Sequence, residues 1–207
     1  VKIAELTQKG RTLVLVAKNE ELLGGIGISD TIRPDAAEMV RRLRKNGIKK
    51  LVMLTGDAPE TAKSITAEAG IYNVQARLLP EDKLDILKQL KNQGHTVAMV
   101  GDGINDAPAL AAADIGIAMG VAGTDVAIET ADVALMVDDL TKIPEALRIS
   151  KLTLRNIHQN VVIALVTVSA LLAGVFAGSV HMAEGMLIHE LSVMLVILNG
   201  MRLKWTR

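Results

Sequence analysis

A segment that follows a predicted strand, together with a lysine further along the chain, indicates phosphate chemistry. Thr55, Gly56 and Asp57 come directly after an apolar run at 50–54, where a helical pattern is about to begin. A hydroxyl group and glycine backbone N–H groups at the start of a helix form a ready cradle for an anion. Lys83, near the start of a second predicted helix, could neutralise the same phosphoryl group as a point charge.

The segment Gly-Asp-Gly-Ile-Asn-Asp at 101–106 indicates a divalent cation site. It follows the predicted strand 96–100, and its glycines make a tight turn between Asp102 and Asp106. Two carboxylates held close together suit Mg²⁺, which takes one or two carboxylates and keeps waters and substrate oxygens as its other ligands. Ligands of parallel α/β sheets bind beyond the carboxyl ends of the strands, so this cation would lie beside the phosphate cradle.

Each of these residues also has a simpler structural explanation. Asp57 could cap the helix 59–69, with Glu60 as its capping-box partner, and Asp106 could cap the helix that follows it. Lys83 alone could be a solvated surface lysine. The three segments nevertheless follow successive units of one predicted sheet. Their joint occurrence favours the phosphate and Mg²⁺ interpretation over three unrelated structural roles.

The elements that position these residues alternate between short β-rich runs and amphipathic helical patterns. This alternation implies βαβ crossovers, and therefore an α/β fold with a parallel sheet and flanking helices. The clearest helical patterns cover 59–69, which Gly70 ends, and 81–92. The predicted strands are 13–17, 23–28, 50–54, 96–100, 115–118 and 133–137.

Two long apolar runs predict a transmembrane hairpin after the α/β part. Residues 161–180 contain no charged side chain, and residues 186–201 contain only His189 and Glu190. Runs of about 20 apolar residues match the thickness of a bilayer core. Basic residues flank the pair on both sides, which places both ends in the cytoplasm. The alternative of two buried core helices fits these lengths and flanks less well.

Composition narrows the class further. The formal net charge of zero provides no basic surface for a nucleic acid, so we expect no nucleic-acid partner. Without any cysteine, the chain has neither a disulfide framework nor a thiolate metal site. The chain begins at Val1 with no signal-peptide pattern, and we expect it to be a piece of a longer protein.

Taken together, these motifs resemble the phosphorylation domain of P-type ATPases, which belongs to the haloacid dehalogenase-like superfamily. The resemblance rests on Thr-Gly-Asp at 55–57, Pro-Glu-Asp-Lys at 80–83 and the block from Val97 to Gly120 that contains Gly-Asp-Gly-Ile-Asn-Asp-Ala-Pro-Ala-Leu. Asp-Thr-Ile-Arg-Pro at 30–34 resembles the hinge strand that returns from the nucleotide domain.

The resemblance implies a role for each motif residue. Thr55 and Gly56 would contact the transferred phosphoryl group, with Asp57 in the same catalytic set, and Lys83 would offset the phosphoryl charge. Asp102 would ligate Mg²⁺, and Asn105 and Asp106 would complete that site. Positioning and electrostatics would then supply most of the rate enhancement, with Mg²⁺ and ATP as cofactors.

The chain also departs from the family pattern. The Asp-Lys-Thr-Gly-Thr motif with the phosphorylated aspartate and the Thr-Gly-Glu motif of the actuator domain do not occur in residues 1–207. ATP would therefore act through domains outside these residues. We predict that the isolated chain neither autophosphorylates nor hydrolyses ATP. Formation of an acid-stable aspartyl-phosphate on the isolated chain would contradict this prediction.

The second apolar run contains candidate ligands for the transported ion, because an ionisable group inside a bilayer is a functional candidate. Imidazole and carboxylate at His189 and Glu190 suit Zn²⁺, Co²⁺, Fe²⁺ or Ni²⁺ better than alkali ions. On a helix Glu190 points about 100° away from His189. Solvation of His189 near the interface and pairing of Glu190 with another helix are the alternative interpretation.

The membrane segment also bears on the subgroup. Two spans after the phosphorylation domain resemble the heavy-metal subgroup of P-type ATPases, with zinc, cobalt and cadmium among its ions. The stretch 189–203 resembles the last span of its cobalt-type branch.

We therefore expect an incomplete haloacid dehalogenase-like α/β domain followed by a two-helix transmembrane hairpin. The end of a nucleotide-binding domain would cover 1–29, the phosphorylation domain 30–145 and the membrane part 146–207, with spans near 161–180 and 184–203. The leading hypothesis is the C-terminal segment of a multi-pass metal exporter of a bacterial plasma membrane, in contact with lipid and a divalent metal cation. A membrane-tethered phosphatase of the same superfamily and a non-catalytic Mg²⁺-binding remnant are the alternatives.

Overall fold

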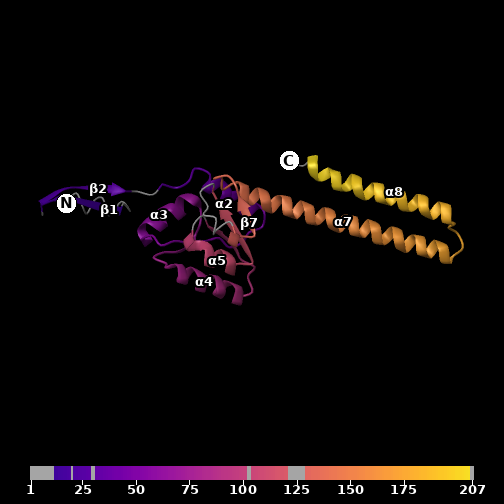
Figure 1. Ribbon diagram of the computed structural model, residues 1–207, viewed down its shortest axis with the longest axis horizontal. Coiled ribbons are helices and arrows are strands. Elements are labelled where there is room, and N and C mark those ends of the chain that lie inside the picture. Colours follow the sequence, from indigo (N-terminus) through magenta and orange to yellow (C-terminus); the bar gives the residue numbers. More distant parts are fainter. Residues whose placement is uncertain (1–11, 20, 29–30, 102–103, 121–128, 206–207) are drawn as a thin grey trace. The chain divides into compact units, whose positions relative to one another are not determined.

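The computed structural model describes residues 12–19, 21–28, 31–101, 104–120 and 129–205 (Figure 1). The chain divides into two compact units, Val1–Pro144 and Glu145–Arg207. The first unit holds every described strand, and the second holds the two long apolar helices.

The amino-terminal strands form an antiparallel ribbon. β1 (Thr12–Lys18) pairs with β2 (Glu21–Ile28), so that Val14 lies opposite Ile26. Both strands were predicted from their apolar runs. Their described apolar side chains remain exposed, Leu15 at 54% and Leu23 at 61%. A lone two-stranded ribbon is marginal in water, so this ribbon requires packing partners beyond those that the structure describes.

The other strands are parallel, as predicted, but they form two separate ladders. β3 (Val52–Leu54) pairs with β4 (Asn73–Gln75), while β5 (Ala98–Gly101) pairs with β6 (Ile115–Met119), which pairs with β7 (Val133–Leu135). Within the described ranges no ladder joins β3 to β5. The sequence did not predict β4, because three residues with one apolar side chain give no periodic signal.

In the described part of the chain, four helices connect or flank these strands: α2 (Ala36–Lys45), α3 (Pro59–Ala69), α4 (Pro80–Asn92) and α5 (Ala107–Ala112). The bounds of α3 equal the predicted range, since Pro59 starts it and Gly70 ends it in the left-handed conformation at φ 74°. The capping role expected of Asp57 is wrong, because Ala58 is the N-cap residue and makes no side-chain cap bond. The described residues 31–34 form no strand, and the expected role of 30–34 as a hinge stays a prediction.

The core of the first unit is small and aliphatic. Leu87 of α4 and Leu110 of α5 are each 1% exposed, and Leu110 packs with Ala118 of β6. Gly116 permits this packing, because a Cβ atom there would lie 2.6 Å from the carbonyl oxygen of Leu110. At the start of β6, the backbone N–H of Val97 and then the ammonium group of Lys91 lower the pKa of Asp114 below its ordinary value.

The second unit is a helical hairpin. α7 (Lys142–Phe176) runs for 35 residues, about 52 Å, and α8 (Met182–Met201) runs for 20 residues beside it in the opposite direction (Figure 1). A short helix η2 (Arg202–Trp205) follows. Both long helices are long and apolar enough to cross a membrane. The predicted hairpin is confirmed, and α7 runs without a break from Lys142 into the first apolar run.

The hairpin turn depends on Gly174. Its carbonyl oxygen accepts the backbone N–H groups of Ser179 at 2.9 Å and Val180 at 3.2 Å. A Cβ atom at Gly174 would lie 2.5 Å from a methyl group of Val180, so only glycine allows this close approach. Gly178 completes the turn at φ 68°, a conformation that side chains other than glycine rarely adopt.

Candidate functional site

The predicted phosphate cradle lies at the carboxyl end of β3. Thr55 is buried, and its Oγ1 donates to Oδ2 of Asp57 at 2.6 Å while it accepts the backbone N–H of Asp57 at 3.1 Å. These two bonds close the turn around Gly56, which is exposed. The carboxylate of Asp57 is thus held by Thr55 and does not cap α3.

The loop before α4 is hydrogen-bonded to this turn. The backbone N–H of Leu78 donates to the carbonyl of Thr55 at 3.0 Å, and that of Arg77 donates to the carbonyl of Asp57 at 2.9 Å. Gly56 lies close to the same loop, since a Cβ atom there would be 3.4 Å from the carbonyl oxygen of Leu78. These contacts hold the loop before α4 against the cradle.

Lys83 projects from the first turn of α4 to Asp106. Its Nζ lies 2.6 Å from Oδ1 of Asp106, and the two side chains are only 15% and 14% exposed. The start of α4 is fixed by Pro80 and by the carboxylate of Asp82, which accepts the backbone N–H of Leu79 at 2.8 Å. Lys83 is therefore neither a solvated surface lysine nor a free cation.

Asp106 is seated against the end of β5. It belongs to the short helix η1 (Ile104–Asp106), and Gly101 leaves the space that its side chain fills. A Cβ atom at Gly101 would lie 2.7 Å from Cβ and 2.8 Å from Oδ2 of Asp106. Although Asp106 precedes α5, its side chain makes no cap bond there, so the capping explanation is wrong for this residue.

These contacts join the carboxyl ends of β3 and β5 through α4. Thr55 touches the loop before α4, Lys83 leaves α4, and Asp106 lies over Gly101. Asn105 is exposed beside Asp106. Asp102 lies outside the described residues, so its place beside Asp106 stays a prediction. The structure thus connects the phosphate residues after β3 with Asp106 after β5 through the loop before α4 and Lys83.

The proposed metal residues of the membrane part are not brought together. His189 and Glu190 are both exposed on α8, and the buried position that faces α7 is Ser192. Glu190 lies about 160° around the helix from Ser192. Among the residues that the structure describes, no group of three or more His, Asp and Glu side chains could hold a metal ion.

Sequence reasoning missed a cluster of amide side chains at the open end of the hairpin. Asn156 is 8% exposed and donates to the backbone carbonyl of Asn199, and Asn160 and Gln159 join the same network. The available signal was the occurrence of four amides beside two otherwise apolar runs, where unpaired polar groups are costly.

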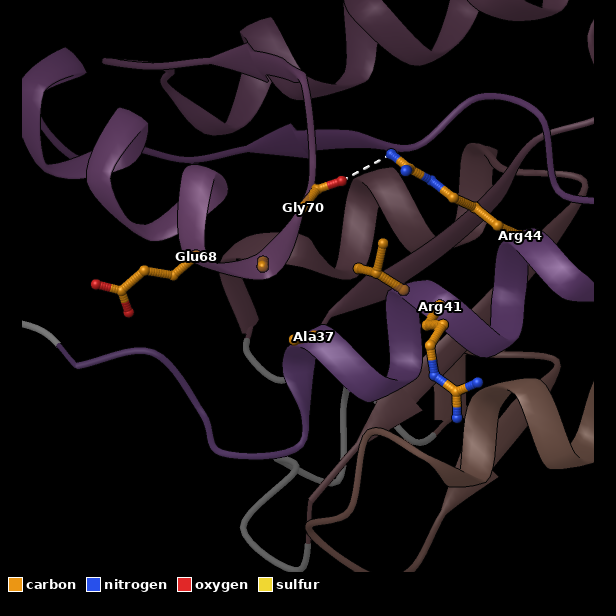
Figure 2. A pocket seen from close by; sticks show the side chains of 7 residues that line it. Ala37, Arg41, Arg44, Glu68 and Gly70 are labelled. Atoms are coloured by element: carbon orange, nitrogen blue, oxygen red, sulfur yellow. Dashed lines mark hydrogen bonds between the residues drawn. The ribbon is translucent and has the colours of Figure 1, made fainter.

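A shallow pocket of about 300 Å³ lies elsewhere, between α2 and α3 (Figure 2). Arg44 reaches across it to the carbonyl oxygen of Gly70 at 2.7 Å and also covers the ring of Tyr72 at 5.0 Å. Arg41 is bound to Glu38, and with Arg42 it lowers the pKa of Glu38 to about 2. The arginines of this pocket thus serve structural contacts.

A known family accounts for this fold and site. The family model of the haloacid dehalogenase-like hydrolases matches residues 1–114, more than half of the chain. The chain belongs to this family.

Its relatives define a narrower group. The zinc-transporting ATPase of Bacillus subtilis (strain 168) is 48% identical over 200 residues, and the probable cadmium-transporting ATPase of Listeria monocytogenes is 46% identical over 202 residues. These matches cover 97% and 98% of this chain but 31% and 28% of the relatives. The chain therefore spans about a third of the length of these curated relatives.

Solved structures agree with the sequence relatives. The crystal structure of a zinc-transporting PIB-type ATPase in its E2.Pi state matches with a TM-score of 0.85 at 44% identity, over 98% of this chain and 33% of that chain. The predicted resemblance to heavy-metal-transporting P-type ATPases is confirmed. The named relatives are zinc and cadmium transporters, so the preference for the cobalt-type branch stays a prediction.

Proposed function

We propose that residues 1–207 are a segment of an ATP-driven exporter of divalent transition-metal cations, a multi-pass P-type ATPase. The observation that carries this proposal is the 48% identity over 97% of the chain, because one alignment includes both the Lys83–Asp106 site and the two apolar helices. In this proposal 1–29 end a nucleotide-binding domain, 30–145 belong to the phosphorylation domain and 146–207 form the membrane part. The α/β part is cytoplasmic and the membrane is a bacterial plasma membrane.

The phosphorylated aspartate comes from outside these residues. β3 and β5 each pair on one edge only among the described residues, with β4 and β6. Their carboxyl ends carry Thr55 and Asp106, which the loop before α4 and Lys83 connect. One further strand between β3 and β5 would join the two ladders into a single sheet of six strands. An aspartate at the carboxyl end of that strand would lie between Thr55 and Asp106.

The residues of the phosphate cradle and Lys83 then each have a role in phosphoryl transfer. An aspartate oxygen attacks the γ-phosphorus of ATP, the bond from that phosphorus to the ADP oxygen breaks, and water later cleaves the aspartyl-phosphate. The hydroxyl of Thr55 and the backbone N–H of Gly56 bind the phosphoryl oxygens, and Asp57 orients that hydroxyl through its 2.6 Å bond. Lys83 offsets the negative charge.

The residues around Asp106 fit Mg²⁺. The space over Gly101 admits the Asp106 carboxylate, and Lys83 engages only Oδ1 in the described contacts. With the amide of the exposed Asn105 and the carboxylate of Asp102, the donor set is all oxygen, as Mg²⁺ prefers. When bound, Mg²⁺ supplies positive charge to the phosphate oxygens.

In this proposal Glu190 binds the transported ion on the side of α8 that does not face α7, whereas His189 lies only about 60° around the helix from Ser192 and so is nearer the face toward α7. Ser192 faces α7, and Glu190 lies on nearly the opposite side of the helix, so Glu190 is directed to helices outside residues 1–207. Zinc and cadmium relatives and the imidazole–carboxylate pair both support a divalent transition metal, with cobalt as the branch predicted from residues 189–203.

Metal activation of the full-length protein tests this assignment. In proteoliposomes, Zn²⁺, Cd²⁺ or Co²⁺ should stimulate ATP hydrolysis. His189→Ala or Glu190→Ala should raise the half-activating metal concentration by about 10-fold or more, the usual cost of disturbing a metal site. His181→Ala at the exposed hairpin tip is the matched control and should leave activation unchanged. Unchanged activation in both the His189 and Glu190 variants would contradict the proposed ion site.

A further inference from the structure

The polar cluster at the open end of the hairpin is a closed ring of amides. Nδ2 of Asn156 donates to the carbonyl oxygen of Asn199 at 2.6 Å, Nδ2 of Asn199 donates to Oδ1 of Asn160 at 2.9 Å, and Nδ2 of Asn160 donates to Oδ1 of Asn156 at 3.1 Å. Each of the three amides thus donates one hydrogen bond within the ring, and the ring crosses twice between α7 and α8. We call Asn156, Asn160 and Asn199 the amide ring.

Neighbouring side chains support the ring. Oε1 of Gln159 accepts from Nδ2 of Asn199 at 3.2 Å, and Nη1 of Arg202 donates to Oδ1 of Asn199 at 3.3 Å. Asn156 is buried even though most of the hairpin surface is exposed. Hydrogen bonds that share donor and acceptor groups polarise one another, so the ring should act as one unit.

Along the rest of the contact between α7 and α8, the described side chains form no comparable hydrogen bonds from one helix to the other. Toward the turn, the half-buried α7 positions are Ile163, Thr167, Leu171 and Gly174, and the hydroxyl of Thr167 bonds within its own helix to Ile163 at 2.8 Å. Between membrane helices apolar contact alone gives little specificity, since lipid tails are equally apolar. Together with the turn at Gly174, hydrogen bonds between the helices therefore contribute to their axial and rotational register.

The amide ring lies between the start of α7 and the ion-binding residues of α8. Asn156 lies 14 residues, about 21 Å, along a helix that begins inside the first unit at Lys142. Asn199 lies about 15 Å along α8 from His189. A helix without a break transmits displacement along its axis, and the described α8 is continuous over this distance.

We infer that the amide ring is the joint through which α7 moves α8, and that Asn156 and Asn199 are positioning residues for the ion site at His189 and Glu190. This inference rests on the proposed transport function. A displacement that starts in the phosphorylation domain would pass along α7, cross at the ring and shift the ion-binding side chains of α8. Without the ring, phosphorylation would proceed but would no longer move the ion site by the same amount.

The test compares ion transport with ATP hydrolysis in one preparation of the full-length protein in proteoliposomes. Asn156→Leu removes the buried donor with little change of volume, and Thr167→Val is the matched control that removes a seam hydrogen bond without crossing the helices. We expect Asn156→Leu to lower the number of Zn²⁺ ions transported per ATP by about fivefold or more, the scale of a typical coupling free energy. Phosphorylation of the variant by inorganic phosphate should stay at the wild-type level.

A ratio of ions to ATP that is unchanged in Asn156→Leu would overturn the inference. If that variant fails to fold, Asn199→Ala decides the question. It keeps the backbone carbonyl of residue 199, which accepts the hydrogen bond from Asn156, but removes the side-chain amide that closes the ring. A parallel loss of phosphorylation and transport in Asn199→Ala would assign the ring a structural role only and would also overturn the inference. Failure of the wild-type protein to transport Zn²⁺, Cd²⁺ or Co²⁺ would instead contradict the proposed function.

Discussion

Replacing Lys83 with methionine should lower the ATPase turnover of the full-length protein by about 100- to 1000-fold, the cost of removing one preorganised charge from a transition state. The methionine preserves most of the volume but removes the ammonium group 2.6 Å from Asp106. The phosphoryl group then loses its countercharge, and the Asp106 carboxylate, 14% exposed, loses its partner. Turnover and formation of the aspartyl-phosphate would be measured together.

Lys88→Met on the same helix is the matched control. Lys88 is 59% exposed and its ion pair with Asp85 is 3.6 Å long, so its loss should leave turnover unchanged. Thermal unfolding separates chemistry from stability, because the unpaired Asp106 should reduce the free energy of unfolding by about 1–3 kcal/mol. If Lys83→Met and Lys88→Met hydrolyse ATP at the same rate, Lys83 has no role in phosphoryl transfer.

Replacing Gly101 with alanine should lower turnover by about 100-fold, as expected for a displacement of about 1 Å in a catalytic group. The added methyl group would lie 2.7 Å from Cβ of Asp106, which no real contact allows. Asp106 must move, yet Ala107 and Ala109 immediately after it are buried and restrict that movement. The pairing of Asp106 with Lys83 and the proposed contact with Mg²⁺ would both be displaced.

The dependence of turnover on Mg²⁺ concentration identifies this effect. Gly101→Ala should require more Mg²⁺ for half-maximal activity, which a general loss of stability would not produce. Gly24→Ala is the control, because a Cβ atom at Gly24 has no heavy atom within 4 Å. Equal Mg²⁺ dependence in the two variants would mean that the close approach of Gly101 and Asp106 has no bearing on the cation site.

Both predictions concern residues that act at the edge where β3 and β5 end. In the described residues this edge is stabilised from one side only, by the loop before α4 and by the Lys83–Asp106 pair. The two ladders that flank it are not joined to each other. In the function proposed above, a strand from outside residues 1–207 would complete both the sheet and the phosphate site.

Sequence alone was sufficient for features that depend on neighbouring residues. The limits of α3 follow from Pro59 at its start and Gly70 at its end, because both residues act on the backbone locally. The two apolar helices follow from hydropathy and length, and the α/β class follows from the alternation of strands and helices. The motif residues Thr55, Lys83 and Asp106 were recognised by type and spacing.

Tertiary structure decided which of these residues meet. Asp57 is of a residue type that often caps helices. In the structure, however, the hydroxyl of Thr55 binds its carboxylate, and Ala58 occupies the N-cap position. Lys83 and Asp106 are 23 residues apart, and Asn156 and Asn199 are 43 apart. Contacts at such separations depend on how whole helices and strands pack, and local patterns carry no record of that packing. For this reason the sequence identified the chemistry of the site. Only the fold paired Lys83 with Asp106 and joined the two apolar helices through hydrogen bonds of their amide side chains.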